Sequence, residues 1–375
     1  MKYYVIAGEA SGDLHGANLL SGLKKLDAQA SFRCWGGDKM KAEGADVVKH
    51  IRDLAFMGFA EVLMNIRTIS KNLRFCKEDI VNYQPDVLIL IDYPGFNLRI
   101  AEYAHQKGIK VFYYISPSVW AWKEGRVEIV KRAVDKMFVI LPFEKPFYAK
   151  HNCEVDYEGH PLIDEIEKIK NEIPSFESFI SENKLSGKPL IAFLPGSRKQ
   201  EIKTMLPVML NMQKHFPDHE IVIAGAPNLN EAYYNSICDI GNTRIVSGKT
   251  YQLLHHSKAG IIKSGTSTLE AALFNLPQVC CYAGNAATIW IARRLAKVKY
   301  ISLPNLIMDK PVVKELIQQD LNEELLKQEL QLLVTEGNYR NEMLENYKKL
   351  KQVLGGSGAS ERIAKKMYSY LTATN

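Results

Sequence analysis

Short apolar runs alternate with longer stretches of helical periodicity along most of the chain. This alternation is typical of doubly wound parallel sheets. In the first half we predict strands at residues 3–7, 32–35, 87–92, 111–115 and 137–141. In the second half we predict strands at residues 190–194, 220–224, 243–246, 259–262 and 278–282. Their nearly continuous apolar character indicates that helices cover both faces of each sheet.

The length of 375 residues suits two domains better than one. The polar segment 163–188 contains two prolines and a Gly-Lys pair, and it predicts an interdomain linker. We therefore expect α/β Rossmann-like domains over residues 1–170 and 189–350. The tail from about Asn322 is predicted to be helical, and residues 351–375 are expected to pack back on the first domain. Two such domains facing a cleft would place an active site there, at the carboxyl ends of both sheets.

Composition narrows the class of protein. Charged residues of both signs are intermixed and 46% of the chain is hydrophobic, which indicates a globular protein. The net charge of +6 suits a nucleotide, a phosphate or an anionic membrane surface, but also a slightly basic cytoplasmic enzyme. The six cysteines lack C-x-x-C spacing, which argues against a zinc site or a disulfide framework. The N-terminal strand breaks at glycine before a signal-peptide core could form, so we expect a cytoplasmic protein.

The first strand leads into GEASGDLHGANLL, residues 8–20. Its glycines allow a sharp turn into a helix whose N-terminus can bind an anion or a hydroxyl group. The motif is not the G-x-G-x-x-G dinucleotide fingerprint. Glu9 and Asp13 could both cap the helix; we interpret Asp13 as the cap and Glu9 as a ligand-binding residue.

Asp92 ends the run DVLILID and precedes a Pro-Gly turn. A carboxylate at this end of a buried strand is expected at the active edge of the sheet. The alternative is an aspartate that stabilises the turn by binding the amide of Phe96 or Asn97. Nearby, Trp120 and Trp122 could stack on a sugar or contact acyl chains, or could pack beneath their own loop.

Two loops of the second half suit phosphate. The first, LPGSRKQEI, carries a Gly196–Ser197 turn and Arg198, which can pair with a phosphate, but it lacks the ending of a P-loop. The second, IIKSGTSTLE, places Ser264, Gly265 and Thr266 at a helix N-terminus. Glu270 on that helix could bind ribose hydroxyls, or form a capping box with Ser267. Without a D-x-D pair, these loops predict a metal-independent nucleotide-diphosphate site.

Eight motifs occur in the order found in lipid A disaccharide synthases: AGEASGDLHGA, MGFAEVL, YISPSVWAWK, LPFE, EGHPL, LPGSRKQEI, SGTSTLEAAL and LPNL. The chain resembles this family from Ala7 to about Gln318. The resemblance implies the two-domain GT-B fold. It also implies transfer of 2,3-diacylglucosamine from UDP-2,3-diacylglucosamine to 2,3-diacylglucosamine 1-phosphate. The products would be a β-1,6-linked disaccharide 1-phosphate and UDP, made in lipid A biosynthesis. We expect no cofactor, because the UDP-sugar is itself the donor substrate.

The resemblance also implies roles for residues. It places Glu9 and Asp92 on the acceptor side and Arg198 at the UDP diphosphate. It makes Ser264, Gly265, Thr266, Thr268 and Glu270 the nucleotide loop, with Asn305 and Gln318 as further cleft residues. The chain departs from the family pattern where Gly95 replaces a second acid, where AGNAAT follows Tyr282 without a basic residue, and where Lys310 replaces an arginine.

An α-linked donor that gives a β-linked product requires one in-line displacement and one base, for which we favour Asp92, with Glu9 orienting the acceptor. Rival interpretations are the transferase that completes the peptidoglycan lipid precursor, a UDP-sugar 2-epimerase, and a non-catalytic nucleotide-sugar binding protein. The retained carboxylates favour an enzyme. The basic, apolar stretches 54–77 and 289–300 predict peripheral binding to the cytoplasmic leaflet of the inner membrane. The alternative is that their apolar faces cover a sheet as ordinary core. No nucleic-acid partner is expected, and a homodimer is left open.

Overall fold

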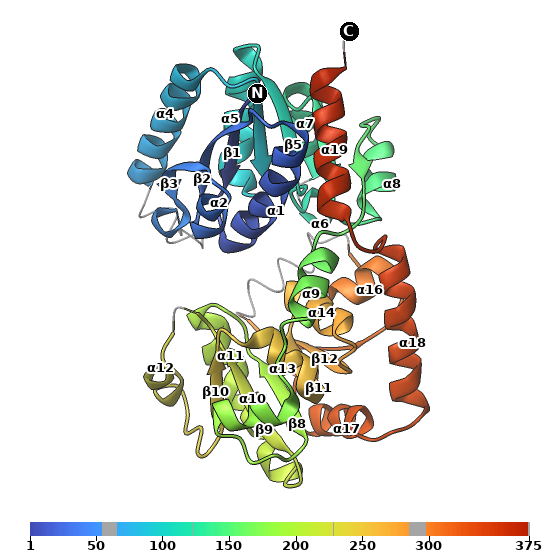
Figure 1. Ribbon diagram of the computed structural model, residues 1–375. Helices are drawn as coiled ribbons and strands as arrows, with labels where there is room; N and C mark the ends of the chain where they lie inside the picture. The colour runs from blue at the N-terminus through green and yellow to red at the C-terminus, as the bar shows by residue number, and fades with distance from the viewer. Residues whose placement is uncertain (55–65, 123, 228, 285–297, 374–375) are drawn as a thin grey trace. The chain divides into compact units, whose positions relative to one another are not determined.

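The computed structural model describes residues 1–54, 66–122, 124–227, 229–284 and 298–373. The chain forms two compact units (Figure 1). The first contains Met1–Asp164 together with Gly355–Asn375, and the second contains Glu165–Leu354. The first unit is therefore built from two separate segments of the chain.

The first unit is organised around a seven-stranded sheet in the order β3-β2-β1-β4-β5-β6-β7, and neighbouring strands are parallel. Its strands are β1 (Lys2–Ala7), β2 (Ser31–Gly36), β3 (Asp46–His50), β4 (Val87–Ile91), β5 (Lys110–Tyr114), β6 (Lys136–Val139) and β7 (Asp156–Tyr157). Strands added after β1 first extend the sheet on one side and, from β4 onwards, on the other. The strand order thus reverses between β1 and β4.

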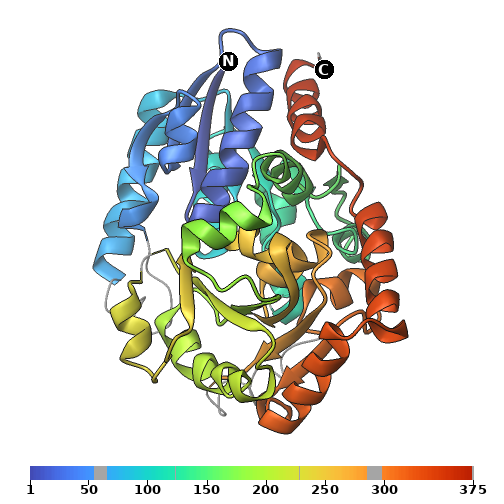
Figure 2. The same cartoon turned by 60° about the horizontal axis from the view of Figure 1, so that its bottom comes forward.

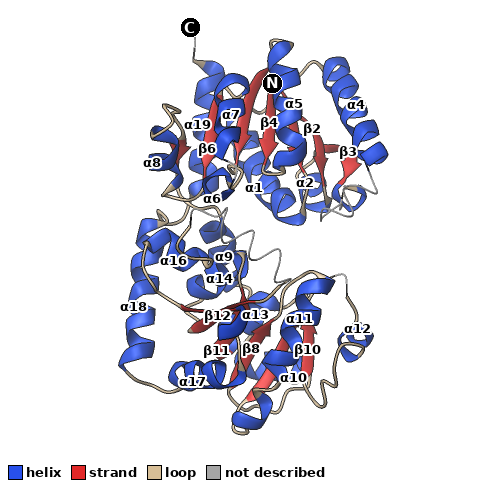
Figure 3. Cartoon of the chain, turned by 180° about the vertical axis from the view of Figure 1, so that it is seen from behind, coloured by secondary structure: helices blue, strands red, loops and turns tan. Residues whose placement is uncertain are grey.

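Helices cover both faces of this sheet, as Figure 3 shows. They are α1 (Ala10–Leu26), α2 (Asp38–Ala42), α4 (Ile66–Tyr83), α5 (Pro94–Gln106), α6 (Val119–Trp122), α7 (Val127–Ala133), α8 (Glu144–Ala149) and α19 (Ala359–Thr372). Alternate residues of β1 point to opposite faces. Tyr4 and Ile6 belong to one apolar cluster and Tyr3 and Val5 to the other. The sheet is therefore buried on both sides.

Helix α19 lies along α1, as Figure 1 and Figure 2 show. Leu19, Leu20 and Leu23 of α1 share an apolar cluster with residues of α19. The two helices approach closely at Gly22, where a Cβ atom would lie 2.7 Å from the Cβ of Ala364. The C-terminal helix is thus part of the core of the first unit.

The second unit contains a six-stranded sheet in the order β10-β9-β8-β11-β12-β13, again with parallel neighbours. Its strands are β8 (Leu190–Leu194), β9 (Glu220–Gly225), β10 (Arg244–Ser247), β11 (Ser257–Lys263), β12 (Gln278–Tyr282) and β13 (Lys314–Ile317). Its helices are α10 (Phe176–Asn183), α11 (Lys199–Leu210), α12 (Glu231–Asn235), α13 (Thr250–His256), α14 (Thr266–Leu273), α16 (Leu303–Met308), α17 (Glu323–Val334) and α18 (Asn338–Val353). Helix α9 (Leu162–Lys170) spans the boundary between the units. The strand order reverses between β8 and β11.

All ten predicted strands are present, with ends within two residues of those expected. The prediction missed β3, β7 and β13, which are short edge strands. The prediction that 163–188 is a linker was wrong, because α9 and α10 lie within it. These helices bury Ile166 and Phe179 even though most of their residues are polar. In the described ranges, no helix is long and apolar enough to cross a membrane.

Candidate active site

The topology of each sheet brings the predicted loops together in pairs. In doubly wound sheets, ligands bind outside the carboxyl ends of the strands where the strand order reverses. In the first unit Ala7 of β1 pairs with Ile91 of β4, so Glu9 and Asp92 follow neighbouring strands. In the second unit Leu194 of β8 pairs with Ile262 of β11. The loops 194–202 and 261–277 therefore leave the sheet side by side.

The backbone at Asp92 is held in an unusual conformation. Asp92 and Tyr93 have φ angles of 46° and 48°. Such left-handed conformations are strained for residues other than glycine and persist where the surroundings enforce them. Here the Asp92 N–H donates to the carbonyl of Tyr114 at 3.1 Å. The Asp92 carbonyl accepts from Asn97 Nδ2 at 2.8 Å and from the Tyr113 hydroxyl at 2.6 Å. The backbone thus fixes the position of the carboxyl group.

The surroundings of Asp92 raise the pKa of its carboxyl group. Burial, and then the negative charge of Glu9, raise its pKa to about 6, although the Tyr93 N–H donates to it. A base with a pKa near the working pH is effective in proton transfer. The alternative role in the turn is not observed, since the N–H groups of Phe96 and Asn97 donate to the carbonyl of Tyr93. Glu9 is the N-cap residue of α1, but its side chain makes no capping hydrogen bond.

Asp13 has a structural role that differs from the predicted one. Its buried carboxylate accepts from the backbone N–H groups of Gly37, Lys39 and Met40, at 2.6, 3.1 and 3.1 Å. It therefore caps α2 and not its own helix α1. The prediction was wrong because Asp13 follows the N-cap of α1 by one turn, where its side chain faces the β2–α2 connection.

A buried carboxyl group, Glu144, joins the loops that follow β5 and β6. It accepts from the Leu141 N–H at 2.9 Å and from Trp120 Nε1 at 3.2 Å. Burial raises its pKa to about 7. The Trp120 ring packs edge-on against Phe143, with ring centroids 4.8 Å apart. Trp120 thus packs against the loop that follows β6, whereas the side chain of Trp122 lies outside the described residues. Glu144 is not among the residues predicted from sequence; the one signal for it is that it is the acid of the motif LPFE.

The loop after β8 requires glycine. Gly196 has a φ angle of 116°, and a Cβ atom there would lie 2.6 Å from Glu201 Oε2. That same oxygen accepts from the Ser197 and Arg198 N–H groups at 3.3 and 3.4 Å. Arg198 is the N-cap residue of α11, and its side chain is 62% exposed. The loop therefore presents a guanidinium group beside two backbone amides.

The loop after β11 ends at the N-terminus of α14, where Gly265 is the N-cap residue and Gly265 and Thr266 are exposed. Two neighbouring side chains hold the loop in place. Ser264 Oγ donates to the Ile301 carbonyl at 2.8 Å, and Thr268 Oγ1 donates to the Gly265 carbonyl at 2.8 Å. The exposed amides and the helix dipole favour an anion at this position.

Glu270 does not form the alternative capping box. Ser267 Oγ donates to the Lys263 carbonyl, and the N-cap of the helix is Gly265. The Glu270 carboxyl group instead accepts from the Tyr251 hydroxyl at 3.2 Å. Burial raises its pKa to about 6. Glu270 is thus a partly buried acceptor one turn into α14.

Asn305 and Gln318 lie in the scaffold of the second unit. Asn305 is 1% exposed, and its Nδ2 donates to the Val313 carbonyl and to Glu315, at 2.9 and 2.8 Å. Its Oδ1 accepts from the Val313 N–H at 2.8 Å. Gln318 exchanges two hydrogen bonds with the backbone of Gly284, at 3.0 and 3.2 Å. Both amides join the ends of strands and helices, so we assign them a positioning role.

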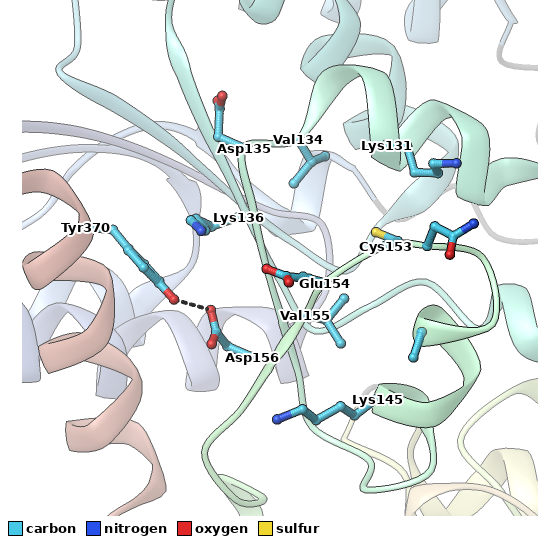
Figure 4. Close-up of a pocket in the computed structure, with 12 residues that line it drawn as sticks. Lys131, Val134, Asp135, Lys136, Lys145, Cys153, Glu154, Val155, Asp156 and Tyr370 are labelled. Carbon is cyan, nitrogen blue, oxygen red and sulfur yellow. Dashed lines mark hydrogen bonds between the residues drawn. The ribbon is translucent and has the colours of Figure 1, made fainter. Parts of the chain in front are cut away.

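A pocket of about 660 Å³ lies at the amino ends of strands of the first sheet, opposite the ends that Glu9 and Asp92 follow (Figure 4). Lys136 and Asp156 line it and begin β6 and β7, so it lies at the amino ends of the strands. Tyr370 of α19 donates to Asp156 there at 3.0 Å. Because Glu9 and Asp92 follow the carboxyl ends of their strands, this pocket is not part of the candidate site.

A comparison with known protein families identifies the family of the chain. The family described as Lipid-A-disaccharide synthetase matches residues 3–367. The chain belongs to this family. A lipid-A-disaccharide synthase from Trichlorobacter lovleyi is 36% identical over 370 residues, 97% of this chain and 96% of that protein. The synthase from Geobacter sulfurreducens is 35% identical over 369 residues, 97% of this chain and 95% of that protein. The resemblance drawn from the motifs is thereby confirmed.

Solved structures show the same fold at low sequence identity. A UDP-GlcNAc 2-epimerase from Neisseria meningitidis bound to UDP-GlcNAc has a TM-score of 0.70 at 14% identity, and the match covers 98% of this chain and 100% of that one. The calicheamicin glycosyltransferase CalG4 has a TM-score of 0.60 at 15% identity, and the match covers 100% of this chain and 98% of that one. This chain thus has the GT-B fold of these epimerases and glycosyltransferases, as the sequence predicted.

Proposed function

We propose that this chain transfers 2,3-diacylglucosamine from UDP-2,3-diacylglucosamine to 2,3-diacylglucosamine 1-phosphate, with inversion at the sugar and without a metal ion. Family membership and the full-length relatives give the coarser statement that the chain is a glycosyltransferase of lipid A biosynthesis. The observation that carries the finer proposal is that two carboxyl groups, Asp92 and Glu9, lie close enough to interact electrostatically. They follow the neighbouring strands β4 and β1, between which the strand order of the first sheet reverses.

Asp92 acts as the general base. It takes the proton of the acceptor hydroxyl as that oxygen bonds to the anomeric carbon of the donor and the bond from this carbon to the diphosphate breaks. One displacement of this kind converts an α-linked donor into a β-linked product. Glu9 accepts a hydrogen bond from the acceptor. Burial raises the pKa of Asp92 to about 6, and the negative charge of Glu9 adds to this increase. UDP leaves with the bonding electron pair.

The second unit binds the UDP leaving group. Arg198 and the amide of Gly265 bind the diphosphate, and the dipole of α14 adds to their effect. The turn at Gly196 lets the backbone approach the phosphate, with Ser264, Thr266 and Thr268 shaping the second loop. Glu270 accepts from the ribose hydroxyls. These donors replace the charge that a divalent metal ion would supply.

Purified protein incubated with both acylated substrates should release UDP and form a disaccharide 1-phosphate, as measured by mass spectrometry. Asp92→Asn is the matched control and should bind UDP without forming product. If the wild-type protein binds UDP but forms no product, a non-catalytic binding protein is favoured instead. Formation of an epimerised UDP-sugar without disaccharide would point to the epimerase alternative.

We also propose that the protein binds the cytoplasmic leaflet of the inner membrane peripherally, because both substrates carry acyl chains. The predicted apolar patch at residues 56–64 and most of the basic stretch 289–300 lie outside the described residues. Within the described part, Arg67, Lys71 and Arg74 are exposed along α4, and Phe75 beside them is 41% exposed. Basic groups at a membrane surface add about 1 kcal/mol each near anionic lipid.

Sedimentation with vesicles that contain an anionic phospholipid tests this binding. Lys71→Glu combined with Arg74→Glu should weaken binding strongly, and added salt should weaken binding of the wild-type protein. Lys150→Glu combined with Lys365→Glu changes the charge equally at exposed positions elsewhere in the first unit and serves as the control. Equal losses in both double variants would show that only the net charge matters and would remove the role of α4.

A further inference from the structure

A partly buried ion pair links the two phosphate-type loops of the second unit. Lys263 is the last residue of β11, and its Nζ lies 2.8 Å from Glu201 Oε1 in the first turn of α11. The two side chains are only 18% and 19% exposed. Since α11 follows β8 and Lys263 directly precedes Ser264, this pair joins the loop after β8 to the loop after β11. Neither residue is among the site residues predicted from sequence.

The Glu201 carboxylate has the surroundings of a bound phosphate. Its Oε2 accepts from the Ser197 and Arg198 N–H groups, and its Oε1 accepts from the Lys263 ammonium group. The Arg198 guanidinium lies 3.9 Å away. Backbone amides together with an ammonium and a guanidinium group are the donors that bind phosphate in proteins. Burial raises the pKa of Glu201, but the hydrogen bond and charge of Lys263, followed by Arg198, outweigh burial and lower it.

Lys263 retains donors beyond this pair. An ammonium group has three N–H donors, and Glu201 Oε1 takes one of them. The Tyr282 ring lies on another side, with its centroid 5.6 Å from Nζ, which further restricts the side chain. The charges of Lys263 and Arg198 exceed that of Glu201, so the cluster keeps a net positive charge. This charge lies beside the amides of both loops.

We propose that Lys263 binds the diphosphate of the donor directly, while Glu201 positions it. This inference rests on the proposed nucleotide site of the second unit and adds a diphosphate-specific residue to it. The Lys263 ammonium donates to a diphosphate oxygen without giving up Glu201, and it stabilises the charge that grows on UDP as the glycosidic bond breaks. The residue would therefore make the site selective for nucleotides that carry a diphosphate.

The test compares binding of UDP and of uridine to the full-length protein by calorimetry. Lys263→Met should weaken UDP binding at least tenfold and leave uridine binding unchanged. Lys263→Arg, which keeps the positive charge, should recover most of the affinity for UDP. Lys258→Met is the matched control, because Lys258 is exposed at the other end of the same strand β11, and it should bind UDP like the wild-type protein.

Lys263→Met also leaves the negative charge of Glu201 unpaired, and this charge alone would repel UDP. The double variant Lys263→Met with Glu201→Gln separates the two effects. If Lys263 contacts the diphosphate, the double variant stays at least tenfold weaker for UDP. Recovery of wild-type affinity in the double variant would mean that Lys263 merely neutralises Glu201, and this result would overturn the inference.

The remaining outcomes distinguish the inference from the function on which it rests. Equal weakening of UDP and uridine binding in Lys263→Met would indicate a structural role for Lys263 and would refute the inference alone. If Arg198→Ala weakens UDP binding but Lys263→Met does not, the nucleotide site stands without Lys263. If the wild-type protein does not bind UDP, or if neither variant changes its UDP affinity, the proposed nucleotide site itself fails.

Discussion

The substitution Asp92→Asn should lower activity and raise stability at the same time. The asparagine keeps the shape of the side chain but cannot accept the proton, so we expect turnover to fall by roughly 10²–10⁴-fold. The pKa of Asp92 is raised from 3.8 to about 6, mainly by burial and then by Glu9. That difference corresponds to roughly 3 kcal/mol against the charged form in the folded protein. The charged Asp92 carboxylate therefore lowers the stability of the folded protein.

The sign of the stability change follows from this pKa. Because the folded pKa lies above the unfolded value, the protonated form is favoured in the fold, and its contribution is lost as the pH rises through about 6. At pH 8 the ionisation of Asp92 lowers the free energy of unfolding of the wild-type protein by about 3 kcal/mol, and at pH 5 by roughly half of this. Denaturant unfolding of both proteins at these two pH values should show a larger gain for Asp92→Asn at pH 8.

The pH dependence of kcat/KM provides the kinetic half of the experiment. Wild-type activity should fall below about pH 6, as Asp92 becomes protonated. Glu9→Gln removes the nearby negative charge, so it should lower the pKa of Asp92 and move this acid limb to lower pH. If Asp92→Asn stays active while Glu9→Gln is inactive, the two roles are exchanged. If both variants are active, the assignment of the base is wrong.

Three further substitutions test other parts of the site. Arg198→Ala should weaken UDP binding by roughly 1.5–3 kcal/mol, since it removes a charge-assisted contact. EDTA should leave the activity of the wild-type protein unchanged. Rescue of an EDTA-treated enzyme by magnesium would contradict metal independence. Asp13→Ala should destabilise the first unit by about 1–3 kcal/mol for each of the three amides left without an acceptor, measured by denaturant unfolding, while the UDP affinity of the folded protein stays normal. Asn305→Ala should likewise lower the thermal midpoint, and a loss of UDP affinity without any loss of stability would instead indicate a direct contact.

The sequence predicted best the buried central strands and the residues that directly follow them in the chain. The strands at the centre of each sheet are buried on both faces, so their apolar runs were found within two residues of their ends. Strand β7 has two residues, and β3 includes Lys49 and His50 at a sheet edge, which leaves little apolar signal. The positions of Glu9 and Asp92 could be predicted because each directly follows such a central strand.

Partners far apart in the sequence could not be predicted. Lys263 and Glu201 are separated by 62 positions, and by sequence alone each resembles a charge on a solvated surface. The hydrogen bond from Trp120 to Glu144 likewise forms only when the loops after β5 and β6 meet. Asn305 shows the reverse case, because a residue within the recognisable motif LPNL uses its amide for the scaffold. Motifs thus predicted the loops of the candidate site, whereas the contacts of individual residues in those loops depended on tertiary structure.

The return of α19 to the first unit makes the second unit, in topological terms, an insertion into the first. During synthesis the N-terminal strands emerge first, but α1 meets Ile363, Ala364 and Met367 only after nearly the whole chain has been translated. The second unit, formed by one continuous segment, has all its residues available earlier. Until α19 emerges, the apolar side of α1 that packs on it, next to the loop that bears Glu9, stays uncovered on the nascent chain. Completion of the core of the first unit is thereby coupled to synthesis of α19.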